Sequence, residues 1–391
     1  METEVVLAGA VRTPIGKFGG KLAGFAAADL GVVAARAAID RAGVDPGRVD
    51  QAIFGHARQA GGGPNAARQV ALRAGLPVDR PAYTINQACL SGMQAILAAA
   101  RAIRVGEAEI VLAGGMEAMS RVPFLLDGRW GLRMGHKPLV DAMYRDGYTD
   151  PICDKLMGQT AETLAGRYDI SRKEQDGFAA RSQQRCEAAR KSGRFRDEIV
   201  EVEIPAKGGT ERFSADEHPR DGVTAEALAK LPPVFEENGS VTAGNSSGIT
   251  DGAAALLVLG EHSARRLGVA PMARIRGWRV DAVEPEVMGL GPVPAVRKLH
   301  EETGTRPDEV DLVELNEAFA AQVLAVDREL QFDPERLNVN GGAIALGHPS
   351  GCSGARIVVT LLHEMARRDG RLGLATLCVS GGMGGALLLE R

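Results

Sequence analysis

The chain is predicted to have an α/β fold, in which helices cover a mostly parallel sheet. Apolar, β-branched runs alternate with helical stretches in both halves of its 391 residues, which is typical of this architecture. Gly accounts for 49 residues and aromatic side chains for only 4%. The interior is therefore expected to consist of small and aliphatic side chains, with its elements packed closely.

An internal repeat supports the same fold class. Three segments near the start of the chain resemble three segments near its end, in the same order. The pairs are 42–50 with 303–311, 85–92 with 339–354, and 110–116 with 377–383. Each pair is offset by about 260 residues, so we infer that one α/β unit is duplicated.

Local patterns predict individual elements. A β-like stretch ends at 85, and apolar residues at helical spacing predict a helix over 91–103. A charged helix is expected over 175–191. Further strands are predicted after 50, after 311, at 249–258 and at 374–378.

The length favours two or three domains. Residues 1–118 with 250–270 are predicted to form the N-terminal copy, and residues 271–391 the C-terminal copy. Residues 119–249 have a different composition and are predicted to be an inserted loop domain. Their helical patterns and many apolar residues argue against a linker.

Charge and cysteine content exclude several classes of protein. The net charge of −4 gives no reason to expect nucleic acid or an anionic membrane as a partner. The five cysteines are scattered without CxxC or metal-ligand spacing, so neither a disulfide framework nor a metal site is expected. With an acidic N-terminus and no membrane-length apolar run, the protein is predicted to be cytoplasmic.

Cys89 is the first candidate nucleophile, because it lies where a β-like stretch ends and a helix begins. Unpaired N–H groups at a helix N-terminus favour the thiolate, which is the reactive form of cysteine. The alternative is a buried, inert thiol.

Three more candidates lie in the second copy, whose strand ends would meet those of the first around a pseudo-twofold axis. His348 lies in a Gly-rich loop, although a lone loop His is usually structural. Cys378 ends a strand before a Gly-rich turn whose amides suit an oxyanion, although a core role is the simpler interpretation. Asn316 is a candidate for the site or for a helix N-cap.

Taken together, the motifs resemble those of the thiolases, specifically acetyl-CoA acetyltransferases and 3-ketoacyl-CoA thiolases, over essentially the whole chain. The fold implied is a pair of αβαβα units forming a five-layered sandwich. The matching blocks are 11–20, 86–93, 113–120, 241–248, 316–320, 341–354 and 378–384. Each block alone is a weak signal, but their combination and order are specific.

The resemblance implies a role for each candidate. Cys89 is expected to take the acyl group, and His348 to activate that thiol and help hold the thioester oxygen. Asn316 is expected to position a water in the same oxyanion site, and Cys378 to act as the acid and base at the α-carbon. The backbone N–H groups of Cys89 and Ser380 are expected to form a second oxyanion hole.

The same resemblance implies a binding site for acetyl-CoA, CoA and 3-ketoacyl-CoA, with no metal and no further cofactor. The residues expected to bind CoA or the acyl group are Arg220, Leu231, Phe235, Ala243, Ser247, Ala318, Phe319, Met157 and Met288.

Some positions depart from the family pattern. Leu156 replaces the His that is usual in acetoacetyl-specific members, so a longer acyl chain is an alternative. Ser380 replaces a Gly and would be strained if its φ were positive. Ala227 replaces a Ser that contacts CoA, and Ser350 and Cys352 flank the loop of His348.

The function expected is reversible condensation of two acetyl-CoA to acetoacetyl-CoA, in fatty acid metabolism. The alternatives are a broader degradative 3-ketoacyl-CoA thiolase and a non-catalytic acyl-CoA carrier. A ketoacyl-carrier-protein synthase would have a second His in place of Cys378. Residues 121–149 align with the segment through which relatives form tetramers, so a homotetramer is expected.

Overall fold

A ten-stranded mixed sheet forms the centre of the computed structural model, which describes residues 3–391. Its order is β14-β15-β16-β13-β1-β12-β5-β3-β4, with β2 attached to β12. The strands are β1 (Val5–Arg12), β2 (Gly16–Lys17), β3 (Gln51–Gly55), β4 (Ala82–Ile85), β5 (Ile110–Ala118), β12 (Thr250–Gly260), β13 (Ala273–Ala282), β14 (Leu312–Leu315), β15 (Leu372–Val379) and β16 (Met383–Glu390).

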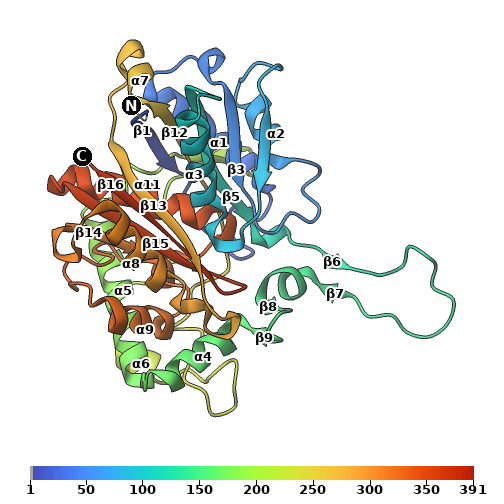
Figure 1. The fold of residues 1–391 in the computed structure, drawn as a ribbon. Helices are drawn as coiled ribbons and strands as arrows, with labels where there is room; N and C mark the ends of the chain where they lie inside the picture. Colours follow the sequence, from blue (N-terminus) through green and yellow to red (C-terminus); the bar gives the residue numbers. More distant parts are fainter. Residues whose placement is uncertain (1–2) are drawn as a thin grey trace.

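The predicted duplication is visible in the topology. β3 and β5 are parallel and β5 and β12 antiparallel, just as β14 and β15 are parallel and β15 and β16 antiparallel. Figure 1 shows the two copies, coloured blue to cyan and orange to red, on either side of the β1 and β13 strands that join them.

Helices and strands alternate in five layers. α1 (Ala27–Ala42) and α2 (Ala66–Arg73) cover the outer face of the first copy, while α8 (Pro292–Thr303) and α9 (Ala320–Leu330) cover that of the second. Between the two copies, α3 (Ser91–Arg104) packs against α11 (Ser350–Arg368) in a large apolar core. Outside residues 119–249, the structure has two further short helices, α7 (Glu261–Leu267) and α10 (Ala343–Leu346).

The expectation of a mostly parallel sheet is wrong. Only β3 with β4, β3 with β5 and β14 with β15 are parallel neighbours. β15 and β16 are joined by the tight turn 380–382 without a crossover helix, so they have to be antiparallel. β12 returns beside β5 after the long insertion and runs antiparallel to it. The individual predicted strands and the helices at 91–103 and 175–191 are confirmed.

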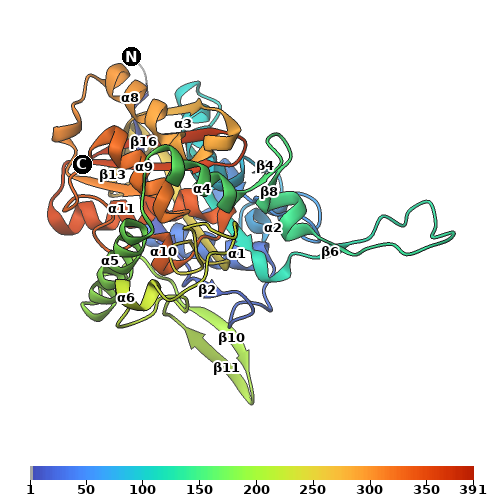
Figure 2. The ribbon, with the colours of Figure 1, turned by 90° about the horizontal axis from the view of Figure 1, so that it is seen from below.

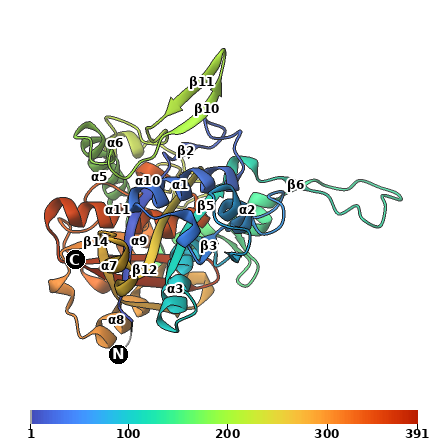
Figure 3. The same ribbon diagram turned by 90° about the horizontal axis from the view of Figure 1, so that it is seen from above.

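The chain between β5 and β12 contributes small elements and two projections. Its elements are β6 (Phe124–Leu125), β7 (Val140–Asp141), the π-helical turn Tyr144–Tyr148, β8 (Thr149–Asp150), β9 (Lys155–Leu156), α4 (Met157–Arg167), α5 (Arg172–Lys191), β10 (Val202–Ala206), β11 (Gly209–Phe213) and α6 (Ala225–Leu228). α4 and α5 pack against the second copy. The loop 126–139 and the β10–β11 hairpin extend away from the body of the molecule (Figures 2 and 3).

Glycines let the two central helices approach closely. A Cβ on Gly92 of α3 would lie 2.7 Å from the backbone nitrogen of Ala355 of α11, and one on Gly354 would lie 2.5 Å from that of Met93. A Cβ on Gly351 would lie 2.6 Å from the carbonyl oxygen of Met116 in β5. Larger residues there would push the helices apart, so these glycines set the spacing of the two helix N-termini.

A buried ion-pair network ties the insertion to β1. Arg12 is fully buried, and its Nε donates to Glu198 at 2.6 Å. Its two Nη atoms donate to the carboxylate of Asp216 at 2.7 and 2.9 Å. Both carboxylates belong to the insertion, so one guanidinium fixes that segment against the first copy.

Replacing Arg12 is expected to destabilise the protein strongly, since two carboxylates would be left buried without their cation. Arg12→Met should lower the free energy of unfolding by about 3–5 kcal/mol in a urea titration. Arg265→Met, which breaks an exposed pair with Glu261, should change it by less than about 0.5 kcal/mol. Equal losses for the two variants would contradict this assignment.

No helix within residues 3–391 is long and apolar enough to cross a lipid bilayer.

Candidate active site

A cavity of about 430 Å³ lies where the N-termini of α3 and α11 meet the turn after β15. All the predicted site residues line it except Asn316 and Leu231. Those that line it are Cys89, His348, Cys378, Ser380, Arg220, Phe235, Ala243, Ser247, Ala318, Phe319, Met157 and Met288. Residues from both copies and from the insertion therefore share one site.

Cys89 lies in a tight turn, residues Ala88–Leu90, between β4 and α3, as its sequence position predicts. Ala88 has a φ of 46°, which is unusual for a residue with a side chain. Asn86 holds this conformation, since its Oδ1 accepts from the Ala88 backbone N–H at 3.0 Å and its Nδ2 donates to the Ala57 carbonyl at 2.9 Å. The strained turn presents the thiol to the cavity.

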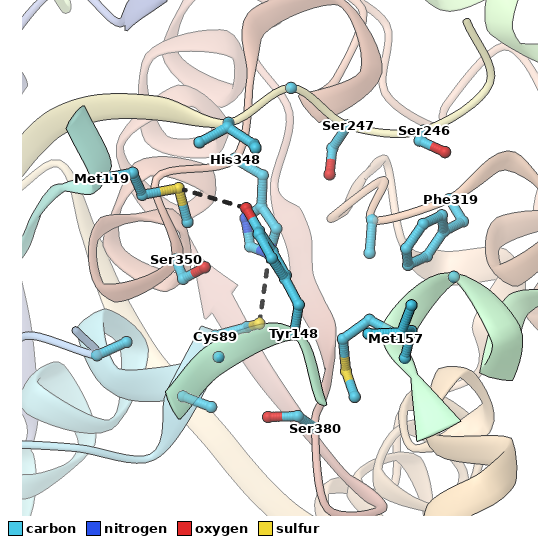
Figure 4. Close-up of a pocket in the computed structure, with 18 of the residues that line it drawn as sticks. Cys89, Met119, Tyr148, Met157, Ser246, Ser247, Phe319, His348, Ser350 and Ser380 are labelled. Carbon is cyan, nitrogen blue, oxygen red and sulfur yellow. Dashed lines mark hydrogen bonds between the residues drawn. The ribbon is translucent and has the colours of Figure 1, made fainter. Parts of the chain in front are cut away.

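His348 faces Cys89 across the interface between the copies (Figure 4), with its Nε2 3.3 Å from the Cys89 sulfur. Its Nδ1 lies 2.5 Å from the hydroxyl oxygen of Ser353. That hydroxyl donates its only proton to the Pro349 carbonyl at 3.1 Å, so it can only accept from Nδ1–H. Nε2 therefore carries the lone pair and can accept the thiol proton.

The resting pair is neutral. Burial raises the pKa of Cys89, although Arg58 and nearby backbone amides act in the opposite direction. Burial, with the charges of Arg58 and Arg356, lowers the pKa of His348 to about 3. The expectation that the helix N-terminus alone acidifies the thiol is wrong for the free protein, because desolvation is the larger effect.

Backbone amides act on the same thiol. The N–H groups of Cys89 and Ser380 lower the pKa of Cys89, against the larger effect of burial. In the turn after β15, Gly381 and Gly382 have φ of 83° and 80°, whereas Ser380 does not have a positive φ. The substitution of Ser for Gly at 380 thus introduces no backbone strain. The buried carboxylate of Asp150 accepts from the Gly381 N–H at 2.9 Å and fixes the turn.

Cys378 lines the cavity from the end of β15 and is only 2% exposed. Burial and the neighbouring Cys89 raise its pKa, so it rests as a neutral thiol. It is thus both a buried core residue and a wall of the cavity, and its sulfur is close enough to Cys89 for their charges to interact.

Asn316 is fully buried behind the cavity wall formed by Ala318 and Phe319. The N-cap interpretation is wrong, because α9 begins at Ala320 and Phe319 is its N-cap residue. Within residues 3–391, neither side-chain atom of Asn316 has a hydrogen-bond partner. A buried amide without a partner is suited to hold a polar group that the protein alone does not supply.

The cavity opens towards residues predicted to bind CoA. Ser247 donates its backbone N–H to the Ala318 carbonyl at 3.0 Å, which joins the 241–248 loop to the start of α9. Phe235 and Phe319 meet edge to face, with ring centroids 6.1 Å apart. Leu231 does not line the cavity, since its side chain packs beside Gly244 and the outer core of the second copy.

Some lining residues were not predicted from the sequence. Arg58 follows the carboxyl end of β3, which neighbours β4, and this position could have indicated that Arg58 lines the cavity. Met119, Tyr144 and Tyr148 belong to the insertion, and the sequence gives no sign that this segment folds over Cys89. His218 borders the mouth near Arg220, held by the Ala345 carbonyl at 2.8 Å.

The other residues that depart from the family pattern lie in different parts of the structure. Leu156 and Ser350 line the cavity, so both bear on its shape. Cys352 is buried in the central core, where burial raises its pKa to about 12 and leaves it an inert thiol. Ala227 lies in the short helix α6 and does not line the cavity.

Family models and curated relatives match nearly the whole chain. A model of the thiolase N-terminal domain matches residues 5–262, and a model of the thiolase C-terminal domain matches residues 269–391. The acetyl-CoA acetyltransferase of Pseudomonas aeruginosa is 53% identical over 99% of both chains. That of Cupriavidus necator is 51% identical over 100% of both chains.

Solved structures are equally similar. The acetyl-CoA acetyltransferase of Bacillus anthracis has a TM-score of 0.97 at 48% identity, covering 100% of this chain and 99% of that one. Human mitochondrial 3-ketoacyl-CoA thiolase in complex with CoA has a TM-score of 0.96 at 43% identity, covering 99% and 98%. With both copies matched, the chain belongs to the thiolase family.

Proposed function

We propose that the protein is an acetyl-CoA acetyltransferase, which condenses two acetyl-CoA to acetoacetyl-CoA and CoA and catalyses the reverse thiolysis. The observation that carries this proposal is the 3.3 Å contact between His348 Nε2 and Cys89 Sγ in a cavity that Cys378 also lines. Acyl transfer followed by carbon–carbon bond formation requires one nucleophile and one separate base.

In the first half-reaction, His348 takes the Cys89 proton as the sulfur attacks the thioester carbonyl of acetyl-CoA. Since the resting pair is neutral, this transfer accompanies the attack. The imidazolium then returns the proton to the departing CoA thiolate. Asn316, through a water, and His348 would stabilise the oxyanion, and the unpartnered amide of Asn316 supports that role.

In the second half-reaction, Cys378 would give its thiol proton to the neutral His348 imidazole and then, as a thiolate, remove a proton from the α-carbon of a second acetyl-CoA. The resulting carbanion would attack acetyl-Cys89, and the departing Cys89 thiolate would take the proton back from His348. The N–H groups of Cys89 and Ser380 would bind the oxyanion, each donor contributing on the order of 10²–10³ in rate. In thiolysis, the neutral Cys378 thiol protonates the same carbon.

CoA would enter past Arg220 and Phe235, with its pantetheine arm along Ser247, Ala318 and Phe319. These residues line the cavity continuously up to Cys89. Met157 and Met288 would contact the acyl group. The scheme uses CoA thioesters as substrates and includes no metal or other cofactor, because two thiols and an imidazole supply the nucleophile and the bases.

A second candidate is a degradative 3-ketoacyl-CoA thiolase of broader chain length. It is favoured by the apolar Leu156 in the cavity wall and by the similarity to the human mitochondrial enzyme. A non-catalytic carrier is disfavoured, because carriage alone does not require a His348–Cys89 contact. A cytoplasmic location and a place in fatty acid metabolism are part of the proposal.

We also propose a homotetramer assembled through the loop 126–139. The apolar side chains on and beside this loop are exposed, among them Trp130 at 89% and Met134 at 92%. An isolated soluble chain rarely exposes such a group of residues, so contact with further copies would bury them. The exposed residues are Phe124, Leu126, Trp130, Leu132, Met134 and Leu139.

Thiolysis of acetoacetyl-CoA by free CoA tests the activity. The wild-type protein should catalyse it, and Cys89→Ala should lower kcat at least about 10⁴-fold because the acyl acceptor is gone. Cys153→Ala, which removes a free thiol that does not line the cavity, is the matched control and should retain activity. No turnover by wild type would overturn the proposal. Faster turnover of 3-ketohexanoyl-CoA would favour the broader degradative enzyme.

The pH profile tests the neutral pair. Since the pKa of His348 is lowered to about 3, its imidazole should accept the thiol proton down to about pH 5. With acetoacetyl-pantetheine, which carries no titrating phosphate, kcat/KM should vary less than about twofold from pH 5 to 7.5. A decrease with an apparent pKa near 6.5, that of free imidazole, would contradict this expectation. Circular dichroism at each pH controls for unfolding.

The assembly is tested by light scattering after gel filtration. Wild type should have the mass of a tetramer, and Trp130→Ser with Met134→Ser should shift it to a smaller species, because the apolar contacts are lost. Thiolysis should persist in the double variant, since neither residue lines the cavity. A wild-type protein that elutes as a dimer would refute this role of the loop.

A further inference from the structure

Arg58 is a buried cation in the cavity wall that the proposed mechanism does not use. Its side chain is only 9% exposed and lines the same cavity as Cys89. Its charge acts on the pKa values of Cys89, His348 and Tyr148, so it lies close to the nucleophile. Arg is almost never this buried without an anionic partner.

The guanidinium of Arg58 has no such partner among residues 3–391. No carboxylate oxygen lies within 4.0 Å of it, its side chain donates no hydrogen bond, and its Nε is buried without an acceptor. Tyr148 covers one side, with its ring centroid 5.0 Å from the guanidinium carbon. The ring and the adjoining backbone of Gly147 pack on the cation but supply no oxygen acceptor to it.

The nearest candidate anion is already occupied. Glu117 is fully buried, and its Oε1 contacts His56 Nε2 at 3.2 Å and accepts from the Arg58 backbone N–H at 3.2 Å. Its Oε2 accepts from the Gly351 N–H at 2.9 Å. Glu117 thus holds the backbone of residue 58 while the Arg58 side chain points elsewhere.

The position of Arg58 indicates which part of a substrate it would meet. The residues that would bind CoA, among them Ser247 and Phe319, lie on one side of the Cys89–His348 pair (Figure 4). Met119, whose sulfur lies 3.9 Å from the Tyr148 hydroxyl, is on the other side. Arg58 packs against Tyr148 and lines the same cavity as Cys89, so it borders the space around the thiol.

We propose that Arg58 binds a carboxylate at the far end of the acyl chain, so that the preferred substrates are 3-ketoacyl-CoA thioesters of dicarboxylic acids. This inference rests on the proposed thiolase activity and specifies its substrate class. A guanidinium binds a carboxylate through two parallel N–H···O bonds, and the bound anion would neutralise the buried charge. A neutral alkyl chain would leave the cation unpaired and is therefore disfavoured.

The reaction on such a substrate is balanced without a further reactant. The Cys89 sulfur attacks the 3-keto carbon as its proton passes to His348, the bond between C2 and C3 breaks, and the Cys378 thiol protonates C2 to release acetyl-CoA. CoA then gives its thiol proton to the Cys378 thiolate and attacks the acyl-Cys89, whose sulfur leaves and takes its proton back from His348 as the ω-carboxyacyl-CoA departs. The distal carboxylate takes no part in bond making and contributes only through its contact with Arg58.

The test compares two six-carbon substrates that differ at one end, 3-ketoadipyl-CoA with a terminal carboxylate and 3-ketohexanoyl-CoA without one. Wild type should cleave the carboxylate substrate with a kcat/KM on the order of 10- to 100-fold higher, the loss expected when a charged hydrogen-bonding group is left unpaired. In Arg58→Leu this ratio should fall to about 1 or below. Arg58→Lys, which keeps the positive charge but cannot donate two parallel hydrogen bonds, should have an intermediate ratio.

Arg145→Leu is the matched control, because Arg145 is exposed on the same segment as Tyr148 and does not line the cavity. Its ratio should equal that of wild type. A wild-type ratio of the two kcat/KM values near 1 would overturn the proposal, and this outcome does not depend on whether a variant folds. A ratio that is unchanged in Arg58→Leu would also overturn it. Acetoacetyl-CoA thiolysis by wild type is measured in parallel, so failure of the thiolase activity itself would be recognised separately.

Discussion

The contact between α3 and α11 is the constraint on which the rest of the site depends. Each helix follows one half of the proposed reacting pair, Cys89 before α3 and His348 before α11. Gly92 and Gly354 remove the side chains that would separate these helices, Gly351 lets α11 approach β5, and the thiol and the imidazole consequently lie 3.3 Å apart. The duplicated fold thus supplies one reactive group from each copy, with the fully buried α3–α11 core holding them in register.

Burial acts on this pair in a single direction, towards the uncharged forms of both groups. A preformed thiolate–imidazolium pair would need solvation that the cavity does not provide. The Ser353 hydroxyl on Nδ1 instead fixes the orientation of the imidazole, so that in the proposed mechanism charge develops only during the reaction. The amides of Cys89 and Ser380 act to lower the pKa of Cys89, so they favour negative charge at the sulfur.

Much of this arrangement could be predicted from the sequence. The repeat indicated both copies, the end of a β-like stretch before a helix indicated Cys89, and Gly-rich segments indicated His348 and the 380–382 turn, since such patterns are local features. Strand direction could not be predicted, because it depends on whether a crossover or a tight turn connects the strands. The lining of the cavity by Tyr148, and its lack of Leu231, could not be predicted, because the path of the insertion over the cavity is set by long-range contacts. The sign of the thiol pKa shift likewise depends on burial, which one turn of sequence does not reveal.

Glu117 limits how the substrate specificity of this fold can change. The Glu117 carboxylate accepts a hydrogen bond from the backbone N–H of Arg58, in the wall of the cavity. It also accepts one from the N–H of Gly351, at the start of α11, which follows His348. The two cannot move independently, so reshaping the loop around residue 58 would also disturb the imidazole. Leu156, which borders the cavity and forms no hydrogen bond with Glu117, is free of that linkage. Substitutions in the insertion can therefore adapt the cavity to new acyl chains more easily than substitutions in the duplicated scaffold. The part of the enzyme that can vary is thus separate from the part that carries Cys89 and His348.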